Sequence, residues 1–452
     1  MIGFTAGRYG QEKANMLIAG VSEKIITPDF PAFLTGYPLP LDRYHTDVHD
    51  DIKAHCFYLQ NRGVRLAIVT LDLCYYSKSR VQIVRRQIEQ ACGIPAGHIM
   101  ISTTHTHSGP APAGIPFGLW DEDREMYPHY LDEVNRQIVA GVQAAMMNVF
   151  PAEIAIGHGI CGKEQNVGGN RRDKEGLTDP QVWVTAIRDD AKAVRGILVD
   201  YALHPTFLHA ENRSLSADYP AYIYEYFQKN DPAVIVGFQM GASGNQSSRH
   251  FRSGQTFAEA RRVGYALASE AQRVLARLEY DSDPQLFSMR ADISPALKPI
   301  PTPEQAAQDQ QNAEKAYQDS VSGHKPYPLQ RTLECALIGA NRRLLIAQAG
   351  EKALDGYRAL LPFEIMVLGI GAGRIVGVPC EMFVEFGLRL KQESPCVLTC
   401  LATTTNGASN GYLYTQEAFA EGGYEPMVSI FAPEAGDQVI DAALGLLRKE
   451  CL

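Results

Sequence analysis

The sequence predicts an α/β protein with a multilayer, mixed β-sheet core flanked by helices and an active site at the C-terminal ends of strands. Three observations lead to this expectation. Strand-like apolar runs alternate with amphipathic helical segments, histidine and acidic side chains follow several of those runs, and 452 residues suffice for a large core. Ligands bind at the carboxyl ends of strands in such proteins, so residues that follow an apolar run are candidates for the site.

Apolar runs of strand length are followed by segments with apolar residues at helical spacing. A buried strand is expected at 66–73, and an amphipathic helix at 77–91 follows it. Two strands at 364–370 and 374–378 are expected to form a hairpin about Gly371. Further strands are expected at 152–157, 196–203 and 234–238, and further helices at 127–147, 256–278 and 437–449.

The expected domain organisation is a single large catalytic domain. Residues 1–15 are polar and are interpreted as a disordered leader, so the domain is expected to span 16–452. The region of about 281–330 is rich in Pro, Gln, Ala and charged residues and is interpreted as a polar helical insertion. Within it, a surface helix is expected at 303–318, near the active site.

Composition excludes several classes of partner. Hydrophobic residues make up 45% of the chain, the net charge is −9, and no Lys/Arg-rich run is present, so nucleic acid is not an expected partner. No apolar stretch reaches the roughly 20 residues of a transmembrane helix. The lack of a hydrophobic signal core and the nine scattered cysteines favour reduced thiols in a cytoplasmic protein. The oligomeric state stays open.

Two histidines follow the apolar run at 99–101. His105 and His107 lie between three hydroxyl residues and the Gly109-Pro110 turn. If the strand continues to this point, residues i and i+2 point the same way, and both imidazoles reach one site. Imidazole is the usual zinc ligand and the usual proton shuttle, so this segment predicts a metal-centred active site. The alternative is that both rings only form hydrogen bonds with neighbouring loops.

Two other runs end in residues that can bind a metal. His204 follows the run at 196–203, and Glu381 follows the run at 376–380. A carboxylate beside a buried strand is unfavourable unless it is paired or bound to a metal. A structural hydrogen bond is the alternative role for His204, and capping of a following helix is the alternative for Glu381.

The segment 103–110, Thr-Thr-His-Thr-His-Ser-Gly-Pro, resembles the His-Thr-His-Ser-Gly-Pro signature of the neutral (non-lysosomal) ceramidase family. Shorter matches follow in the order that the family shows, and the resemblance extends from about residue 17 to 452. Each match is weak alone, whereas so many in one order are specific. They lie at 170–171, 202–206, 216–218, 244–247, 378–383, 411–415 and 423–425.

The resemblance implies a zinc ion bound by His105, His204, Glu381 and Tyr412. Two imidazoles and a carboxylate with an open position are a hydrolytic zinc arrangement. A tyrosine ligand is less usual and has to be phenolate-like or weakly bound. Without the family, Tyr412 reads as an ordinary loop aromatic.

The same resemblance implies four catalytic residues. Ser247 matches the family's catalytic serine, and His107 would form hydrogen bonds beside the metal or shuttle protons. Arg171 and Tyr424 would stabilise the oxyanion of a tetrahedral intermediate, although an arginine next to Arg172 is also typical of a solvated surface pair. The serine segment departs from the family, since Gly-Asn-Gln-Ser replaces Gly-Asp-Val-Ser. The nucleophile is therefore either Ser247 or a water molecule activated by the metal.

The resulting functional hypothesis is a zinc-dependent hydrolase that cleaves an amide or ester bond of a small-molecule acylated substrate. The family's better-known members carry a C-terminal immunoglobulin-like domain, which this sequence is not expected to contain. Two alternatives stay open. One is a cytoplasmic deacylase or esterase of small polar sugar or amino compounds, and the other is a non-catalytic protein that binds a metal or a ligand.

Overall fold

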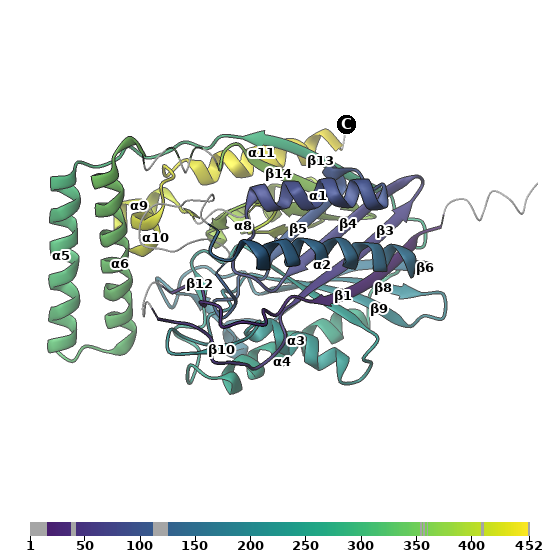
Figure 1. Ribbon diagram of the computed structural model, residues 1–452, viewed down its shortest axis with the longest axis horizontal. Coiled ribbons are helices and arrows are strands. Elements are labelled where there is room, and N and C mark those ends of the chain that lie inside the picture. The colour runs from purple at the N-terminus through teal and green to yellow at the C-terminus, as the bar shows by residue number, and fades with distance from the viewer. Residues whose placement is uncertain are drawn as a thin grey trace, which may run out of the picture.

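In the described residues, two large β-sheets are covered by two groups of helices, and three two-stranded sheets accompany them (Figure 1). The structure is a computed structural model that describes residues 16–37, 42–111, 125–352, 360–407 and 411–450, together with Asp355 and Arg358. The expected leader at 1–15 lies outside the described residues. The larger sheet has eight strands and the smaller sheet has four. This arrangement confirms the expected α/β class with a multilayer mixed sheet.

The eight-stranded sheet consists of two halves, β1-β3-β4-β5 and β6-β8-β9-β11, which are joined by a short pairing between β1 and β6. Its parallel pairs are β4/β5 and β9/β11, and its other neighbours are antiparallel. A helix connects each parallel pair, because parallel strands need a crossover: α1 (Lys78–Cys92) and α3 (Tyr219–Gln228). The strands are β1 (Ile18–Ile25), β3 (Lys53–Asn61), β4 (Val64–Leu71), β5 (Ile99–Thr103), β6 (Phe150–Ile160), β8 (Gln181–Asp189), β9 (Val194–Tyr201) and β11 (Ile235–Met240).

The four-stranded sheet has the order β13-β14-β15-β17. Strands β14 and β15 form the expected hairpin, and β15 pairs in parallel with β17 across the crossover helix α8. These elements are β13 (Leu286–Ile293), β14 (Phe363–Ile370), β15 (Gly373–Gly377), β17 (Leu398–Ala402) and α8 (Val384–Glu393). The remaining short strands are β2 (Asp47–Val48), β7 (Gly169–Asn170), β10 (Ser214–Leu215), β12 (Gln246–Ser247), β16 (Glu381–Met382) and β18 (Tyr412–Leu413).

Side chains alternate between the two faces of each strand, and the apolar ones among them form three layers. On β14, Met366 and Leu368 pack against Phe57 and Ile68 of the larger sheet. Ile365 and its neighbours on the opposite face pack against α8 and α11. The second face of the larger sheet is covered by α1 to α4. Further helices are α2 (Pro128–Met147), α4 (Phe257–Leu275), α9 (Gln416–Glu421), α10 (Tyr424–Val428) and α11 (Ala435–Glu450).

Two helices form a hairpin at one end of the molecule, at the left in Figure 1. The helix expected at 303–318 lies within α5 (Pro303–Ser322), and α6 (Tyr327–Ala349) packs along it. The range 281–330 differs from a purely helical insertion in two ways. Its first part is β13, which pairs with β14, and the helical part continues to Ala349. The alternating apolar residues of β13 are weak as a signal because that strand is only half-buried.

No helix in the described part of the chain is long and apolar enough to cross a membrane. The cytoplasmic location expected from the sequence stays a prediction. The cysteines of the described ranges are all free thiols, and most of them are buried.

The layer between the two sheets generates a prediction about stability. Leu368 is 0% exposed in this layer, so Leu368→Ala should lower the free energy of unfolding by about 2–5 kcal/mol, the range for a buried leucine. Leu177→Ala is the matched control, because that side chain is 58% exposed and its loss should change stability little. Urea denaturation of both variants measures the difference. Equal losses in the two variants would contradict the packing described here.

Candidate active site

The two histidines of the signature segment lie in a turn after β5. The strand ends at Thr103, and His105 has a left-handed backbone with φ of 64°. The ring centroids of His105 and His107 are 5.0 Å apart. The structure therefore brings the two imidazoles together, as the sequence analysis predicted. The cause is this turn, whereas the sequence analysis had expected strand alternation. Residues i and i+2 point to the same face only where the chain is extended.

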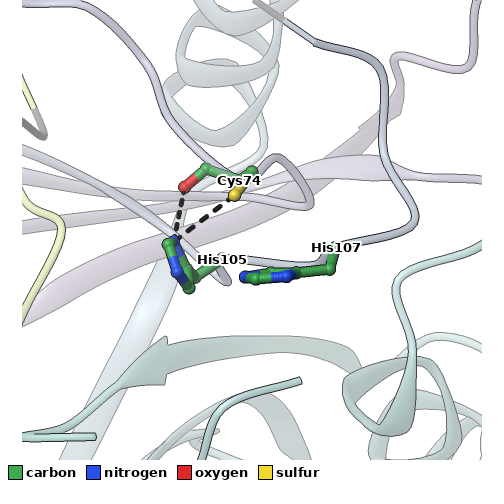
Figure 2. A group of neighbouring side chains, drawn as sticks. All are labelled: Cys74, His105 and His107. Carbon is green, nitrogen blue, oxygen red and sulfur yellow. Dashed lines mark hydrogen bonds between the residues drawn. The ribbon is translucent and has the colours of Figure 1, made fainter. Parts of the chain in front are cut away.

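Backbone carbonyls orient two of the imidazoles. Nδ1 of His105 donates a hydrogen bond to the carbonyl of Cys74 at 2.9 Å (Figure 2), and Nδ1 of His204 donates to the carbonyl of Ser243 at 2.7 Å. A carbonyl only accepts, so each Nδ1 carries the proton of its ring. In its neutral form each ring therefore has its lone pair on Nε2, which is the usual arrangement for a metal-ligating histidine.

Both Nε2 atoms face one carboxylate. Oε2 of Glu381 lies 3.0 Å from Nε2 of His204 and 3.3 Å from Nε2 of His105. Glu381 belongs to β16, which pairs in parallel with β18, so its backbone lies beside that of Tyr412. All three side chains are almost fully buried. Glu381 is therefore positioned by a strand pairing rather than by capping of the helix that follows.

The charges of these three residues are compatible with a bound cation. Burial, together with the charge of Arg171, lowers the pKa of His204 to about 4, so this ring is neutral at pH 7. Burial alone would raise the pKa of Glu381, but His105 and His204 hold it well below its usual range. Burial lowers the pKa of His105, but Cys74 and Glu381 raise it well above its usual value, so a proton on this ring compensates the buried carboxylate when no metal is bound. A metal cation bound between the three side chains would take the place of that proton. The donor set of two imidazoles and a carboxylate fits zinc.

A second group of possible ligands overlaps with the first. Cys74, His105 and His107 also lie close enough together to share a metal ion (Figure 2). The Cys74 thiol lies 3.6 Å from Nδ1 of His105, but that nitrogen carries a proton that it donates to the Cys74 carbonyl. The group of His105, His204 and Glu381 is therefore the better metal site, since its facing atoms have free lone pairs. Cys74 had no sequence signal that would have placed it here.

Two tyrosines lie at this centre. The ring of Tyr412 lies 6.5 Å from that of His204, and its Cα pairs with that of Glu381. Burial raises the pKa of Tyr412 well above its usual value, which favours a protonated and weakly binding phenol. The hydroxyl of Tyr75 donates to Oε1 of Glu381 at 3.4 Å. Sequence reasoning missed Tyr75, since no motif marks it.

The proposed catalytic side chains share one pocket of about 70 Å³. The pocket brings together Ser247, His107, Arg171 and Tyr424 from distant parts of the chain. Helix α6 forms one wall of this pocket, so the helical hairpin does lie beside the site. The other lining residues are Gly36, Tyr37, Thr206, His209, Arg249, Arg252, Arg331, Cys335, Ile338 and Tyr412.

The serine segment is connected to the smaller sheet. Ser247 lies in β12, and its Oγ accepts a hydrogen bond from the backbone N–H of Arg249 at 3.2 Å. Asn245, which replaces an aspartate of the family, accepts from the backbone N–H of Val384 at 2.9 Å and donates to Glu385 at 2.9 Å. An amide supplies both the donor and the acceptor that this position uses, and an aspartate could only accept.

Arg171 is buried and does not form a solvated pair with its neighbour. Its Nε donates to Oε1 of Glu425 at 2.8 Å, while Arg172 pairs with Glu425 and Glu421. Within the described ranges, Nη2 of Arg171 has no hydrogen-bond partner. Buried donors without a partner are rare, so this atom is available to a ligand in the pocket.

His107 is held in place without using its ring nitrogens. Nη1 of Arg43 donates to the carbonyl of His107 at 2.8 Å, and a side chain at Gly36 would meet the ring at 2.3 Å. Neither ring nitrogen has a partner among the described residues. Burial, and then the charges of His105 and His204, lower the pKa of His107 well below its usual value. The ring is therefore a neutral, unengaged base beside the pocket.

Comparison with known proteins places the chain beside the neutral ceramidases. No protein-family model matches the sequence. The chain is 20% identical over 460 residues to neutral ceramidase from Pseudomonas aeruginosa, and the alignment covers 88% of this chain and 67% of that protein.

Solved structures show the same fold. The crystal structure of neutral ceramidase from P. aeruginosa superposes with a TM-score of 0.73 at 18% identity and covers 96% of this chain and 75% of that one. A structure of ceramidase complexed with C2 gives a TM-score of 0.72 at 16% identity and covers 96% and 76% of the two chains. The resemblance inferred from the ordered motifs is confirmed. In sequence and in fold, the chain is therefore neutral ceramidase-like.

Proposed function

We propose that this protein is a zinc-dependent hydrolase that cleaves an amide or ester bond. The observation that carries the proposal is the geometry of His105, His204 and Glu381, in which the Nε2 atoms of both rings face one carboxylate oxygen at 3.3 and 3.0 Å. The similarity to neutral ceramidase, a protein named for the hydrolysis of an amide, supports the reaction class.

His105, His204 and Glu381 would hold the zinc ion, and Tyr412 would be a fourth, weak ligand. A bound zinc ion acts as a Lewis acid that polarises the carbonyl group of the amide or ester bond to be cleaved. The protein's own contribution is to fix the ligands: the Cys74 and Ser243 carbonyls hold the rings in the tautomer that presents Nε2. Burial of the ligands excludes competing water.

Ser247 would be the nucleophile. Its Oγ already accepts a hydrogen bond from the Arg249 backbone, which leaves its own proton to be donated. His107 lines the same pocket with two unengaged ring nitrogens, so it would take up that proton and later deliver it to the leaving group.

Arg171 and Tyr424 would stabilise the oxyanion that forms on attack. Nη2 of Arg171 is a buried donor without a hydrogen-bond partner among the described residues, and Arg171 lines the pocket. Burial raises the pKa of Tyr424, so its hydroxyl keeps the proton that it would donate. Donors held in place before the reaction stabilise developing charge strongly.

The composition of the pocket favours a short acyl group. Ile338 is the one aliphatic side chain among the described lining residues, and the others are polar, charged, aromatic or small. A long acyl chain gains about 0.8 kcal/mol for each methylene that it buries against apolar surface, and this lining offers few aliphatic side chains for such burial. The proposed substrate is therefore a small acylated compound.

Removal of a ligand tests the metal. Purified protein should contain about one zinc ion per chain, and His204→Ala should weaken zinc binding at least about tenfold because one of few ligands is lost. His129→Ala is the control, since that histidine is exposed on α2. Elemental analysis after purification without added metal measures both. Wild-type protein that holds no zinc and takes up none on titration would exclude the proposed centre.

Removal of the serine hydroxyl tests the nucleophile. Ser247→Ala should lower kcat by about a thousandfold or more while zinc content stays unchanged. Ser248→Ala is the matched control, because this neighbouring hydroxyl does not line the described pocket. If a water molecule is the nucleophile instead, the loss in Ser247→Ala would be only about tenfold.

A series of acyl lengths tests the substrate. N-acyl and O-acyl compounds that differ only in chain length should show kcat/KM values that are higher for acetyl than for long chains, and higher than for a long-chain ceramide in detergent. Steady-state kinetics on the series provides the measurement. An increase with every added methylene, by the factor that about 0.8 kcal/mol corresponds to, would instead indicate a lipid groove.

A further inference from the structure

The pocket beside the candidate metal centre carries an excess of positive charge. Arg171, Arg249, Arg252 and Arg331 line it, and no Asp or Glu of the described chain does. The lining residue His209 adds no charge at pH 7, because burial lowers its pKa to about 4. The pocket is therefore strongly cationic in a protein whose net charge is −9.

Arg249 has no carboxylate partner among the described residues. Its guanidinium donates to the carbonyl of Arg171 at 3.3 Å and to the hydroxyl of Thr332 at 3.2 Å, and it lies 3.9 Å from the sulfur of Cys335. Burial, together with the nearby charges of Arg171 and Arg331, lowers the pKa of Arg249. An anion in the pocket would therefore stabilise a charge that the protein itself leaves uncompensated.

Arg252 is in the same situation. Its Nη1 donates to the carbonyl of Thr206 at 3.0 Å and approaches the hydroxyl of Ser248 at 3.5 Å, and it forms no ion pair within the described ranges. Arg331 differs, since Glu334 pairs with it at 2.5 Å. The uncompensated charges of the pocket are therefore those of Arg249 and Arg252.

We propose that the substrate of this hydrolase carries an anionic group, a carboxylate or a phosphate, which Arg249 and Arg252 bind beside the bond to be cleaved. The proposal rests on the hydrolase function argued above and adds the substrate class. A planar guanidinium with several fixed donors matches the oxygens of both anions. Arg249 follows Ser247 by two residues and donates its backbone N–H to the serine Oγ, so the anion would bind close to the reacting carbonyl.

The source of the anion is a small soluble compound rather than a lipid headgroup. The described lining offers one aliphatic side chain, Ile338, so a lipid tail would find few aliphatic side chains to pack against next to the arginines. A carboxylate or phosphate on a short acylated compound fits the charge of this lining.

A pair of probes that differ only in charge tests the proposal. N-acetylglycine carries a carboxylate, and N-acetylglycinamide carries a neutral amide of nearly the same shape. Ligand-detected NMR titration of the zinc-loaded full chain should give at least about tenfold tighter binding of N-acetylglycine at low salt. The ratio of the two affinities should fall towards one in Arg249→Gln and Arg252→Gln. Arg252→Lys should retain part of the preference for N-acetylglycine.

The control variant is Arg62→Gln. Arg62 is exposed, pairs with Asp283 and is far from the pocket residues along the chain. Its affinity ratio should equal that of the wild type. Equal binding of the two probes, or a ratio that survives both glutamine variants because the carboxylate binds zinc alone, would overturn the proposal. Arginine-dependent sedimentation with phosphatidylglycerol vesicles would overturn the assignment to a soluble compound.

Turnover and binding are read separately, so that the two proposals fail independently. If Ser247→Ala keeps the affinity ratio but wild-type protein hydrolyses no acyl compound, the hydrolase function is wrong and the anion site stands. If turnover depends on Ser247 while the two probes bind equally, the anion site is wrong and the hydrolase function stands.

Discussion

The face-to-face packing of the two sheets is the constraint on which the rest of the structure depends. Phe57 and Ile68 of the larger sheet meet Met366 and Leu368 of the smaller one in a dry layer. Alternation along each strand then leaves the outer faces to the helices, which produces the layered architecture. Because that layer fixes the relative position of the sheets, loops that leave different sheets meet at one place.

The candidate metal centre lies where the two sheets meet. His105 and His204 follow strands β5 and β9 of the larger sheet, whereas Glu381 follows β15 of the smaller sheet. A cation bound by all three would therefore join two separately hydrogen-bonded sheets. The backbone pairing of Glu381 with Tyr412 carries the connection into the C-terminal part of the chain, where α10 supplies Tyr424. The chemistry of the site and the cohesion of the fold thus rely on the same contact between sheets.

Local pattern predicted most of the secondary structure, since buried strands and amphipathic helices leave a strong periodicity. The half-buried strand β13 leaves only a weak periodicity, and the sequence analysis did not assign it. The ordered motifs identified His105, His204 and Glu381. The expectation that strand alternation positions His105 was wrong, because the backbone of His105 is left-handed. Arg249, Arg331 and Tyr75 had no motif at all. Their roles depend on contacts between segments far apart in the chain, which a single sequence does not encode in any local spacing.

The hairpin of α5 and α6 has a consequence for how this fold diversifies. Arg331, Cys335 and Ile338 all project from α6 into the pocket, while the possible metal donors come from loops anchored in the sheets. The hairpin stands at one end of the molecule and packs on α10 (Figure 1). Substitutions along one face of α6 would change the lining of the pocket and leave the possible donor atoms untouched. Under the proposed function, selection would act on specificity and on reactivity through different parts of the chain.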